Sequence, residues 1–435
     1  MKKLSANPSS AIGPALIGGS VGLALILWGC ANPLASRVAD GAAVLKSLAN
    51  VAAFSGTVLY SWSLVLSARW LWTDRLFHGL DKVYKWHHIT GGTAFLLLTL
   101  HPLFLTVRAF GVDPSRAISL WVMTDNWQVN FGAIALYSVA LVLLITVFAR
   151  LRHQAFVWIH SILGAVFFLG FLHAVLAHGN MAKFWPLEYY MVFVMLMAIY
   201  AFLYHSVFGL FLPDRYKYEV ASVKQLGKDN VEIILMPKGR LMNFIPGQFA
   251  FVSFHGAPVA PEAHPFSMAS GFREKQLRFV VKALGDHSSS LLALRPKTPA
   301  LIEGPHGGFS YKNTANRSQV WVAGGIGVTP FLAMARSLSP GYTIDFYYCV
   351  LSTADSHFES ELQQLAQIYP SFHLHTFCQD TQGFIDAAFI QKDCGIEGRD
   401  FFLCGPPPMM KAMRSGLLKA GVPDKQIFFE DFSFR

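Results

Sequence analysis

Two apolar stretches of this sequence each carry two widely spaced histidines. The first, WHHITGGTAFLLLTLHPLFLTVR, holds His87 and His101, which are 14 residues apart. On a straight α-helix, 14 residues rise about 21 Å and rotate to within about 40° of four complete turns. The two imidazoles therefore lie on the same face of the helix at different depths. The second stretch, residues 156–178, holds His160 and His173. Ionisable side chains within apolar spans are costly and usually functional.

Neutral imidazoles on two facing helices are suited to haem iron. A single histidine in a helix bundle is ordinarily a hydrogen-bonded polar residue, but four histidines at matched depths favour two stacked b-type haems. We therefore predict that His87 and His160 ligate one haem and that His101 and His173 ligate the other.

The second helix is the less regular of the two in this prediction. The 13-residue step from His160 to His173 leaves their side chains about 140° apart on an ideal helix. This helix therefore needs tilt or a local π-type irregularity, near Gly164 or Gly170.

Two further histidines are alternative ligands. His178 lies 18 residues, or five whole turns, beyond His160 and competes for the outer position. His88 competes with His87 for the inner position.

The composition is that of a membrane protein, because 53% of the 435 residues are hydrophobic and only 14% are charged. Six low-charge stretches can cross about 30 Å of hydrocarbon. They are residues 11–31, 47–68, 89–107, 126–149, 155–178 and 189–213. The first follows Met1-Lys2-Lys3, as a signal peptide would, but its apolar run is long and more spans follow, so we favour an uncleaved helix.

The cations of the short loops orient the helices. With the N-terminus inside, the inner side holds Lys2, Lys3, Arg69, Arg75, Lys82, Lys85, Arg150, Arg152, Arg215 and Lys217. The outer loops hold Arg37, Lys46, Arg108, Arg116 and Lys183. A multi-pass protein of the cell membrane with both termini cytoplasmic is predicted, and His87 and His160 form its inner pair. The net charge of +9 fits anchoring beside anionic lipid, and no basic, aromatic-interleaved patch indicates nucleic acid.

After residue 213 the pattern changes to short alternating apolar runs. Those at 216–223, 231–236, 249–254 and 277–282 predict a small antiparallel β-barrel. From about residue 319, strands alternate with helices, which predicts a parallel sheet covered on both faces. The predicted domains are a six-helix haem-binding membrane domain at 1–213, a barrel at 214–314 and an α/β domain at 315–435. The five cysteines form no CxxC pair, so neither a disulfide framework nor an iron–sulfur cluster is expected.

Two strand-to-helix turns of the α/β domain favour a nucleotide. VAGGIGVTPF places Gly324, Gly325 and Gly327 where close backbone approach and a helix N-terminus suit a phosphate. The spacing is not GxGxxG, and a tight turn with positive φ is the alternative. CGPPPMM, at residues 404–410, repeats the arrangement. Because open α/β sheets bind ligands at the carboxyl ends of their strands, the two turns together predict a dinucleotide cleft.

The paired histidines, the two glycine turns and four further motifs together carry a family resemblance. They occur along the chain in the same order as in the family. HPFSMAS (264–270), KALGDHS (282–288), GPHGGF (304–309) and the tail FFEDFSFR join the paired histidines and the two turns. Together they resemble the NADPH oxidase and ferric reductase superfamily. The second half of the chain is similar to ferredoxin–NADP reductase.

The resemblance implies an FAD site on the barrel. HPFSMAS is similar to a flavin-binding motif, which implies that His264, Pro265, Phe266 and Ser267 border the FAD, with Ser267 near the isoalloxazine. KALGDHS is similar to the segment that holds the FAD pyrophosphate through backbone amides and a hydroxyl. That similarity implies binding by Lys282, Gly285 and Ser288.

The resemblance also implies a nicotinamide nucleotide site. Its pyrophosphate would lie on Gly324, Gly325, Gly327 and Thr329. Cys404, with Gly405 and Pro406, would approach the nicotinamide as hydride passes to the flavin. In the tail, Glu430 matches an acidic family residue, and Phe432 matches the aromatic that stacks on the flavin, with Phe434 as the alternative.

Two departures from the family pattern leave the substrates open. Animal NADPH oxidases place a histidine one turn beyond the outer ligand, where this chain has Leu105. NADP-specific relatives tend to place an arginine after the strand TIDFYYCV, where this chain has Leu351 and Ser352. The donor could be NADH or NADPH.

The expected function is electron transfer from NAD(P)H through FAD and two haems to an outer acceptor. A flavin can split a hydride into single electrons, which a nicotinamide cannot do. Oxygen, giving superoxide, is the first choice of acceptor and a ferric chelate the alternative. A haem-binding transporter or sensor is the alternative of another class, and the tandem flavin and nucleotide motifs argue against it.

Overall fold

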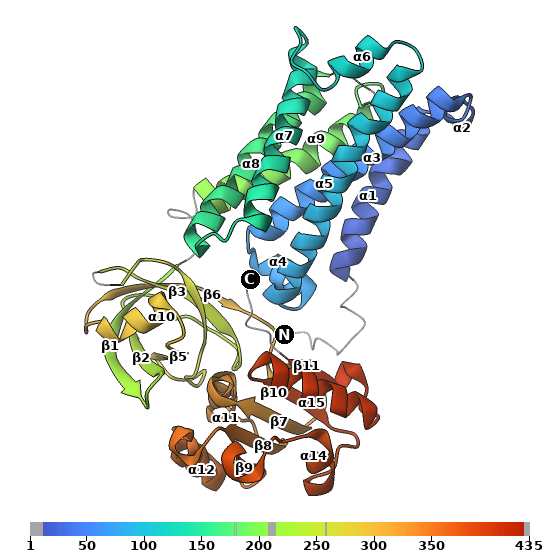
Figure 1. Cartoon of the computed structure of the whole chain (residues 1–435). Helices are drawn as coiled ribbons and strands as arrows, with labels where there is room; N and C mark the ends of the chain where they lie inside the picture. The colour runs from blue at the N-terminus through green and yellow to red at the C-terminus, as the bar shows by residue number, and fades with distance from the viewer. Residues whose placement is uncertain (1–11, 178, 180, 208–214, 257–258, 430–435) are drawn as a thin grey trace. The chain divides into compact units, whose positions relative to one another are not determined.

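The computed structural model describes residues 12–177, 179, 181–207, 215–256 and 259–429 of the chain. It divides into two compact units (Figure 1), one comprising Ser10–Leu212 and the other containing Pro213–Arg435. The tail residues Glu430, Phe432 and Phe434, and the alternative ligand His178, lie outside the described residues.

The first unit is a bundle of long helices. They are α1 (Ile12–Ala31), α3 (Gly41–Ser67), α5 (Leu80–Phe110), α7 (Trp127–Phe148), α8 (His153–Leu176) and α9 (Trp185–Phe202), with the short α2 (Leu34–Arg37), α4 (Leu71–Phe77) and α6 (Pro114–Ser119) between them. Six helices of the described chain are long and apolar enough to span a membrane, which confirms the predicted number. Large apolar side chains such as Leu96, Leu141 and Trp158 are exposed on this unit, as hydrocarbon solvent requires.

Helices α3 and α5 begin earlier than hydropathy predicts. Asp40 caps α3, because its carboxylate accepts a hydrogen bond of 2.7 Å from the Ala43 amide. α5 starts at Leu80 and takes in Lys82 and Lys85, since an α-helix tolerates cations near its ends that a membrane-wide apolar stretch excludes. Hydropathy therefore locates the apolar centre of such a helix and not its ends.

Helix α3 is the central element of the bundle. It packs along α5 and also contacts α1 and α9. Its buried face carries small residues, among them Ala49, Ala52, Gly56 and Ser63. A Cβ on Gly56 would lie 2.8 Å from Leu98 Cγ of α5, so the absence of a side chain lets the two helices approach closely.

The second unit begins with an antiparallel sheet of six strands in the order β4-β3-β6-β1-β2-β5. The strands are β1 (Tyr216–Leu226), β2 (Asn230–Pro237), β3 (Phe249–Phe254), β4 (His264–Ser267), β5 (Leu277–Lys282) and β6 (Pro299–His306). The predicted antiparallel FAD-domain fold is confirmed, although the described strands do not close into a complete barrel. The edge strands meet only at an isolated bridge between Met268 and Phe279, because β4 is four residues long and contains Pro265, which has no amide to donate.

A parallel sheet follows, with the strand order β11-β10-β7-β8-β9. Its strands are β7 (Ser318–Gly324), β8 (Thr343–Val350), β9 (Phe372–Cys378), β10 (Asp400–Cys404) and β11 (Ile427–Phe429). Its main helices are α11 (Thr329–Arg336), α12 (Glu359–Ile368), α14 (Ala387–Asp393) and α15 (Pro407–Lys419). Separate apolar cores, one with α11 and α12 and one with α14 and α15, cover its two faces, which confirms the α/β prediction. The strand order reverses between β7 and β10, where such sheets bind ligands.

An ion-pair network joins the two sheets. Arg278 of β5 is 11% exposed and donates to Glu232 of β2 at 2.6 Å and to Glu361 of α12 at 2.8 Å. Arg336 of α11 donates to Glu361 at 2.7 Å and to Glu274 at 2.8 Å. Burial raises the pKa of Glu361, but the hydrogen bonds and charges of Arg336 and Arg278 outweigh it and hold that pKa below its usual value.

Replacing Arg278 by methionine should destabilise the second unit, because it leaves two half-buried carboxylates short of a cation. We expect a loss of about 2 to 3 kcal/mol, which lowers Tm by roughly 5 to 10 °C in a unit of this size. Thermal unfolding of the purified chain measures it. Arg414→Met is the control, since its partner Asp424 is exposed, and it should change Tm little.

The same experiment has a pH signature. The depressed pKa of Glu361 stabilises the fold fully above its unfolded value of about 4.3, and that contribution is lost as the pH falls through the folded pKa. The Tm difference between the wild type and Arg278→Met should therefore shrink below about pH 4.3. A difference that stays constant down to pH 3 would contradict the assigned role of Arg278.

Candidate functional site

The structure brings His87 of α5 and His160 of α8 together. Their ring centroids are 6.0 Å apart and the rings are inclined by 68°. Two imidazoles bound to one metal ion at about 2.0 Å have centroids about 6 Å apart, so this spacing fits a shared iron. The Nδ1 atom of His87 lies 2.9 Å from the Ser63 carbonyl oxygen of α3. His160 stacks on Phe156, and its Nδ1 is buried without a hydrogen-bond partner in the described part of the chain.

His101 of α5 and His173 of α8 are the second predicted pair. His101 Nδ1 donates to the Ala49 carbonyl of α3 at 2.9 Å, and His173 Nδ1 donates to the Gln128 carbonyl of α7 at 2.7 Å. A nitrogen that faces a carbonyl must carry the proton, which leaves Nε2 as the basic atom. Carbonyl bonds thus place three of the four predicted ligands in the tautomer that binds iron.

The helices that carry the histidines are held apart from each other. α5 packs along α3 and α8 packs along α7, whereas α5 and α8 share almost no close backbone contact. Packed helices lie about 8 to 10 Å apart, so the imidazoles bridge a wider separation. The donor set and this separation fit two haems held between α5 and α8.

Some details of the predicted ligand geometry differ in the structure. α8 is α-helical from His153 to Leu176, so the suggested π-type irregularity near Gly164 or Gly170 is absent. Helix tilt and side-chain rotamers must therefore compensate for the angle of about 140° between His160 and His173. A π-helical segment follows α9 instead, at Leu203–Val207. His88 is exposed, with its ring centroid 5.7 Å from that of His87.

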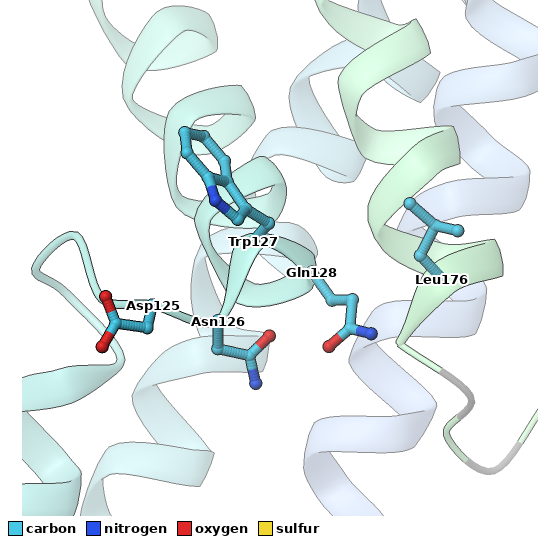
Figure 2. A pocket seen from close by; sticks show the side chains of 5 residues that line it. All are labelled: Asp125, Asn126, Trp127, Gln128 and Leu176. Carbon is cyan, nitrogen blue, oxygen red and sulfur yellow. The ribbon is translucent and has the colours of Figure 1, made fainter.

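An open cleft of about 650 Å³ lies near the second histidine pair, on the side of His173. Asp125, Asn126, Trp127 and Gln128 at the start of α7 line it together with Leu176 at the end of α8 (Figure 2). Because the Gln128 carbonyl is the partner of His173, the cleft adjoins this pair. Leu105, one turn beyond His101, is half-buried, and Arg108 is exposed.

The predicted flavin motif forms a strand edge. His264, Pro265, Phe266 and Ser267 make up β4, which pairs with β3 so that Ser267 lies opposite Phe249. Ser267 is buried, and the other three residues are half-buried.

The KALGDHS segment forms the end of β5, where Lys282 lies, and the start of α10 (Asp286–Ser290). The Ser288 hydroxyl accepts hydrogen bonds of 3.0 Å from the amides of Leu284 and Gly285. This hydroxyl therefore stabilises the turn between β5 and α10.

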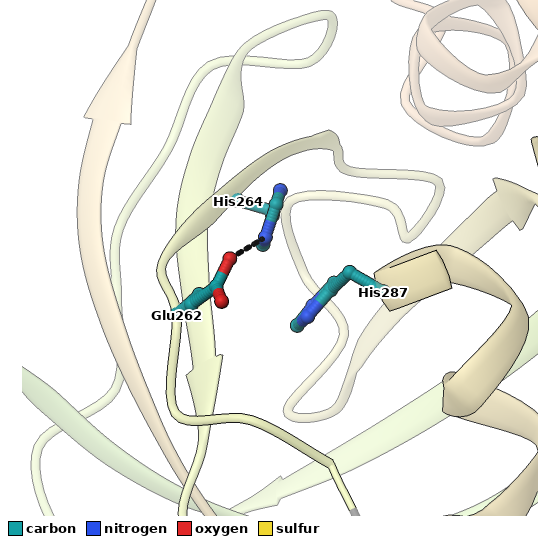
Figure 3. Close-up of side chains that lie close together, drawn as sticks. All are labelled: Glu262, His264 and His287. Atoms are coloured by element: carbon teal, nitrogen blue, oxygen red, sulfur yellow. Dashed lines mark hydrogen bonds and ion pairs between the residues drawn. The ribbon is translucent and has the colours of Figure 1, made fainter. Parts of the chain in front are cut away.

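A cluster that sequence reasoning missed adjoins this turn. The rings of His264 and His287 stack with centroids 3.8 Å apart, and His264 Nε2 lies 3.2 Å from a Glu262 carboxylate oxygen (Figure 3). Both ring nitrogens of His287 are buried without a partner in the described chain. Burial, and then the charge of His264, lower the pKa of His287, so this imidazole is neutral at neutral pH. The donor atoms lie within 4.8 Å of one another and could hold a divalent cation. The sequence signals were His264 in the flavin motif and the position of His287 beside Ser288, and neither indicated that the two rings meet.

The two glycine turns lie against each other at the point where the strand order reverses. Parallel pairing places Cys404 beside Ala323. A Cβ on Gly405 would lie 3.0 Å from the Gly324 amide nitrogen, and one on Gly327 would overlap the Cys404 carbonyl. Glycine is required at these positions because a side chain would force the turns apart.

The remaining residues of the predicted nucleotide site follow the same turns. Gly325 has a φ of +53°, the left-handed conformation that favours glycine. Thr329 begins α11 and donates to the Ile326 carbonyl at 3.0 Å. Pro406 Cδ would lie 2.8 Å from a Cβ on Gly324. Cys404 is fully buried at the end of β10.

Three protein-family models match successive parts of the chain. Residues 52–171 match the ferric reductase like transmembrane component, residues 215–327 match an FAD-binding domain, and residues 321–415 match an oxidoreductase NAD-binding domain. The first match contains His87, His101 and His160 and ends two residues before His173. The last contains both glycine turns.

Curated relatives match part of the chain. The reductase component of propane 2-monooxygenase from Mycolicibacterium goodii is 26% identical over 235 residues, 49% of this chain and 67% of that protein. The electron transfer component of anthranilate 1,2-dioxygenase from Acinetobacter baylyi is 28% identical over 44% of this chain and 59% of that protein. A flavohemoprotein from Rhodopirellula baltica is 32% identical over 26% of this chain and 31% of that protein. The chain therefore spans about one third to two thirds of the length of these relatives.

Solved structures are similar to the chain at low sequence identity. A flavohemoglobin from Malassezia yamatoensis with bound FAD and heme is 19% identical, with 78% of this chain and 96% of that chain covered and a TM-score of 0.48. A ferredoxin NADP+ reductase from Neisseria gonorrhoeae with bound FAD and NADP is 18% identical, with 50% and 99% covered and a TM-score of 0.44. Both scores are below 0.5, so the domain assignment rests on the family matches.

Gly132 of α7 supplies a test of the second histidine pair. A Cβ there would lie 2.9 Å from His173 Nδ1, so Gly132→Ala should displace this imidazole. If His173 is a haem ligand, as predicted, the variant should lose up to half of the haem that the wild type binds. A pyridine haemochrome assay of the purified protein measures the ratio of haem to protein. Gly170→Ala is the matched control, because its Cβ would meet nothing within 4 Å. An unchanged haem content and spectrum in Gly132→Ala would argue against His173 as a ligand.

Proposed function

The chain combines a ferric reductase-like membrane domain with FAD-binding and NAD-binding domains, as the NADPH oxidase and ferric reductase superfamily does, and from that premise we propose a complete electron path. Electrons pass from cytoplasmic NAD(P)H through FAD and two b-type haems to an acceptor at the outer face of the membrane. The protein is an oxidoreductase of the ferric reductase kind, and this path is its activity.

The single observation that supports the haems is the pair of histidine bridges between α5 and α8. His87 and His160 lie at a spacing that suits one iron, and carbonyl bonds fix the tautomers of His101 and His173. Two haems at different depths divide the membrane into shorter electron transfers. When bound, each haem would supply a one-electron redox centre.

The second unit would supply electrons from NAD(P)H to the haems. When bound, FAD would supply a two-electron hydride acceptor that can be reoxidised one electron at a time. The β4 edge and the turn capped by Ser288 would position it, and neutral His287 can donate or accept a hydrogen bond there. The paired turns at Gly324 and Gly405 would bind the nucleotide pyrophosphate, since their backbones approach closely and α11 starts there.

Double histidine variants test the assignment of the ligands. His87→Ala with His160→Ala should remove one haem, and His101→Ala with His173→Ala should remove the other, because each haem then loses both axial bonds. Haem content and the anaerobic spectrum before and after NAD(P)H give the result. Either double variant retaining two haems would contradict the pairing. A wild-type haem that stays oxidised under NAD(P)H would instead favour the transporter or sensor.

Dioxygen, giving superoxide, is the proposed acceptor, and a ferric chelate is the second candidate. Dioxygen needs no shaped site, and a cation such as Arg108 near the outer pair would stabilise a developing anion. Two observations favour a chelate. The cleft lined by Asp125 and Gln128 is large enough for a ligand far bigger than dioxygen, and Leu105 supplies no hydrogen-bonding group.

Two assays separate the acceptors. If oxygen is the acceptor, superoxide dismutase should suppress cytochrome c reduction by the purified protein with NAD(P)H in air. Insensitivity to the dismutase, together with rapid ferric-chelate reduction under nitrogen, would select the chelate. Trp127→Ala, which removes one wall of the cleft, should then raise the KM for the chelate severalfold and leave haem content unchanged.

A further inference from the structure

The carboxyl end of β8 lies where side chains can contact the adenosine ribose of the bound nucleotide. β8 is the neighbour of β7 in the parallel sheet, and β7 leads into the glycine turn. In doubly wound sheets an acidic residue near this point binds the ribose hydroxyls of NAD, whereas an arginine nearby accommodates the 2′-phosphate of NADP. The side chains that follow Val350 therefore decide which nucleotide fits.

An ordered carboxylate lies at this position. After β8, Leu351 is 63% exposed, and Ser352 begins a short 3-10 turn, η6 (Thr353–Asp355). Oδ2 of Asp355 accepts hydrogen bonds from the Ser352 amide at 3.1 Å and from the Ser352 hydroxyl at 2.8 Å. Its other oxygen, Oδ1, has no hydrogen-bond partner in the described chain. Asp355 is exposed, so Oδ1 can accept from a ribose hydroxyl.

The stretch of sequence that contains the end of β8 carries acidic residues but no lysine or arginine. Between Arg336 and Lys392 the sequence holds no lysine or arginine, although the chain has 35 of them, and this stretch includes β8, α12 and β9. Its acidic residues are Asp345, Asp355, Glu359, Glu361, Asp380 and Asp386. The Asp380 amide donates to the Leu351 carbonyl at 3.1 Å, which brings a second acidic residue to the end of β8. Burial, and then the charges of Asp355 and Glu359, raise the pKa of Tyr348.

Two arginines that contact α12 are already engaged with carboxylates. Arg278 and Arg336 both bind Glu361, and each also pairs with a second carboxylate. A 2′-phosphate carries about −1.5 to −2 charges at neutral pH. At this edge it would meet carboxylates without a compensating cation, a repulsion that costs binding free energy.

We propose that the chain selects NADH over NADPH, and that Asp355, held by Ser352, is the residue that excludes the 2′-phosphate. This inference rests on the proposed function, since it concerns the nucleotide of that same site. Asp355 acts by accepting from the ribose hydroxyls of NADH and by repelling the phosphate of NADPH. Selectivity should therefore appear in KM, with kcat little affected.

The test compares both nucleotides on the full-length holoprotein in detergent. We expect kcat/KM for NADH to exceed that for NADPH by at least tenfold, and 5′-AMP to inhibit more strongly than adenosine 2′,5′-bisphosphate. Ser352→Arg with Asp355→Ser should lower the ratio at least tenfold, mainly through the KM for NADPH. Glu397→Ser is the matched control, since it removes an exposed carboxylate that precedes the amino end of β10, away from the carboxyl end of β8, and should leave the ratio unchanged.

Equilibrium binding of each nucleotide, followed by its fluorescence, separates two kinds of failure. NADPH binding as tightly as NADH to the wild type would overturn the selectivity whatever the turnover. Tighter NADH binding without any reduction of the flavin or haem would uphold the selectivity and contradict the proposed electron path. A double variant with an unchanged preference would overturn the role of Asp355.

Discussion

The cost of burying an unpaired polar group in an apolar medium governs the membrane unit. An imidazole between apolar helices needs a partner for each nitrogen. Backbone carbonyls of α3 and α7 supply it for His87, His101 and His173. The carbonyls are available because the histidines approach from a neighbouring helix, which the small residues of α3 permit. The same bonds leave Nε2 free to bind a metal. The hydrogen bonds that stabilise the buried imidazoles therefore also set the tautomer that metal binding needs.

Close backbone approach plays the corresponding part in the soluble unit. The turns that follow β7 and β10 touch only because Gly324, Gly327 and Gly405 lack side chains. Strand pairing then brings the two turns to the point where the sheet order reverses, and a phosphate can meet backbone amides there. The Arg278 network holds the antiparallel sheet against this domain, so the proposed flavin and nucleotide positions depend on one set of ion pairs.

Elements with a local cause were predictable. Apolar length predicted the six spans, and alternation predicted β1, β2, β3 and β5. The sequence reasoning missed β4 as a strand, because its four residues include a proline and show no alternation. The extent of barrel closure was not predictable for a related reason, since closure depends on how far two edge strands pair, and that is not encoded in either strand. The sequence could not show that the His87 ring lies 6.0 Å from the His160 ring while His88 is exposed, because adjacent residues have the same hydropathy context.

By itself the sequence determined the number of spans, the class of each domain, the glycine turns and the histidine spacing, because burial cost and backbone freedom depend on residue type and near neighbours. Only the tertiary structure decided which carbonyl each imidazole meets, that His264, His287 and Glu262 gather at one turn, and that Ser352 holds Asp355 at the end of β8. Those pairings join residues through side-chain directions or across long separations in the chain. Their geometry exists only after the helices and sheets have packed.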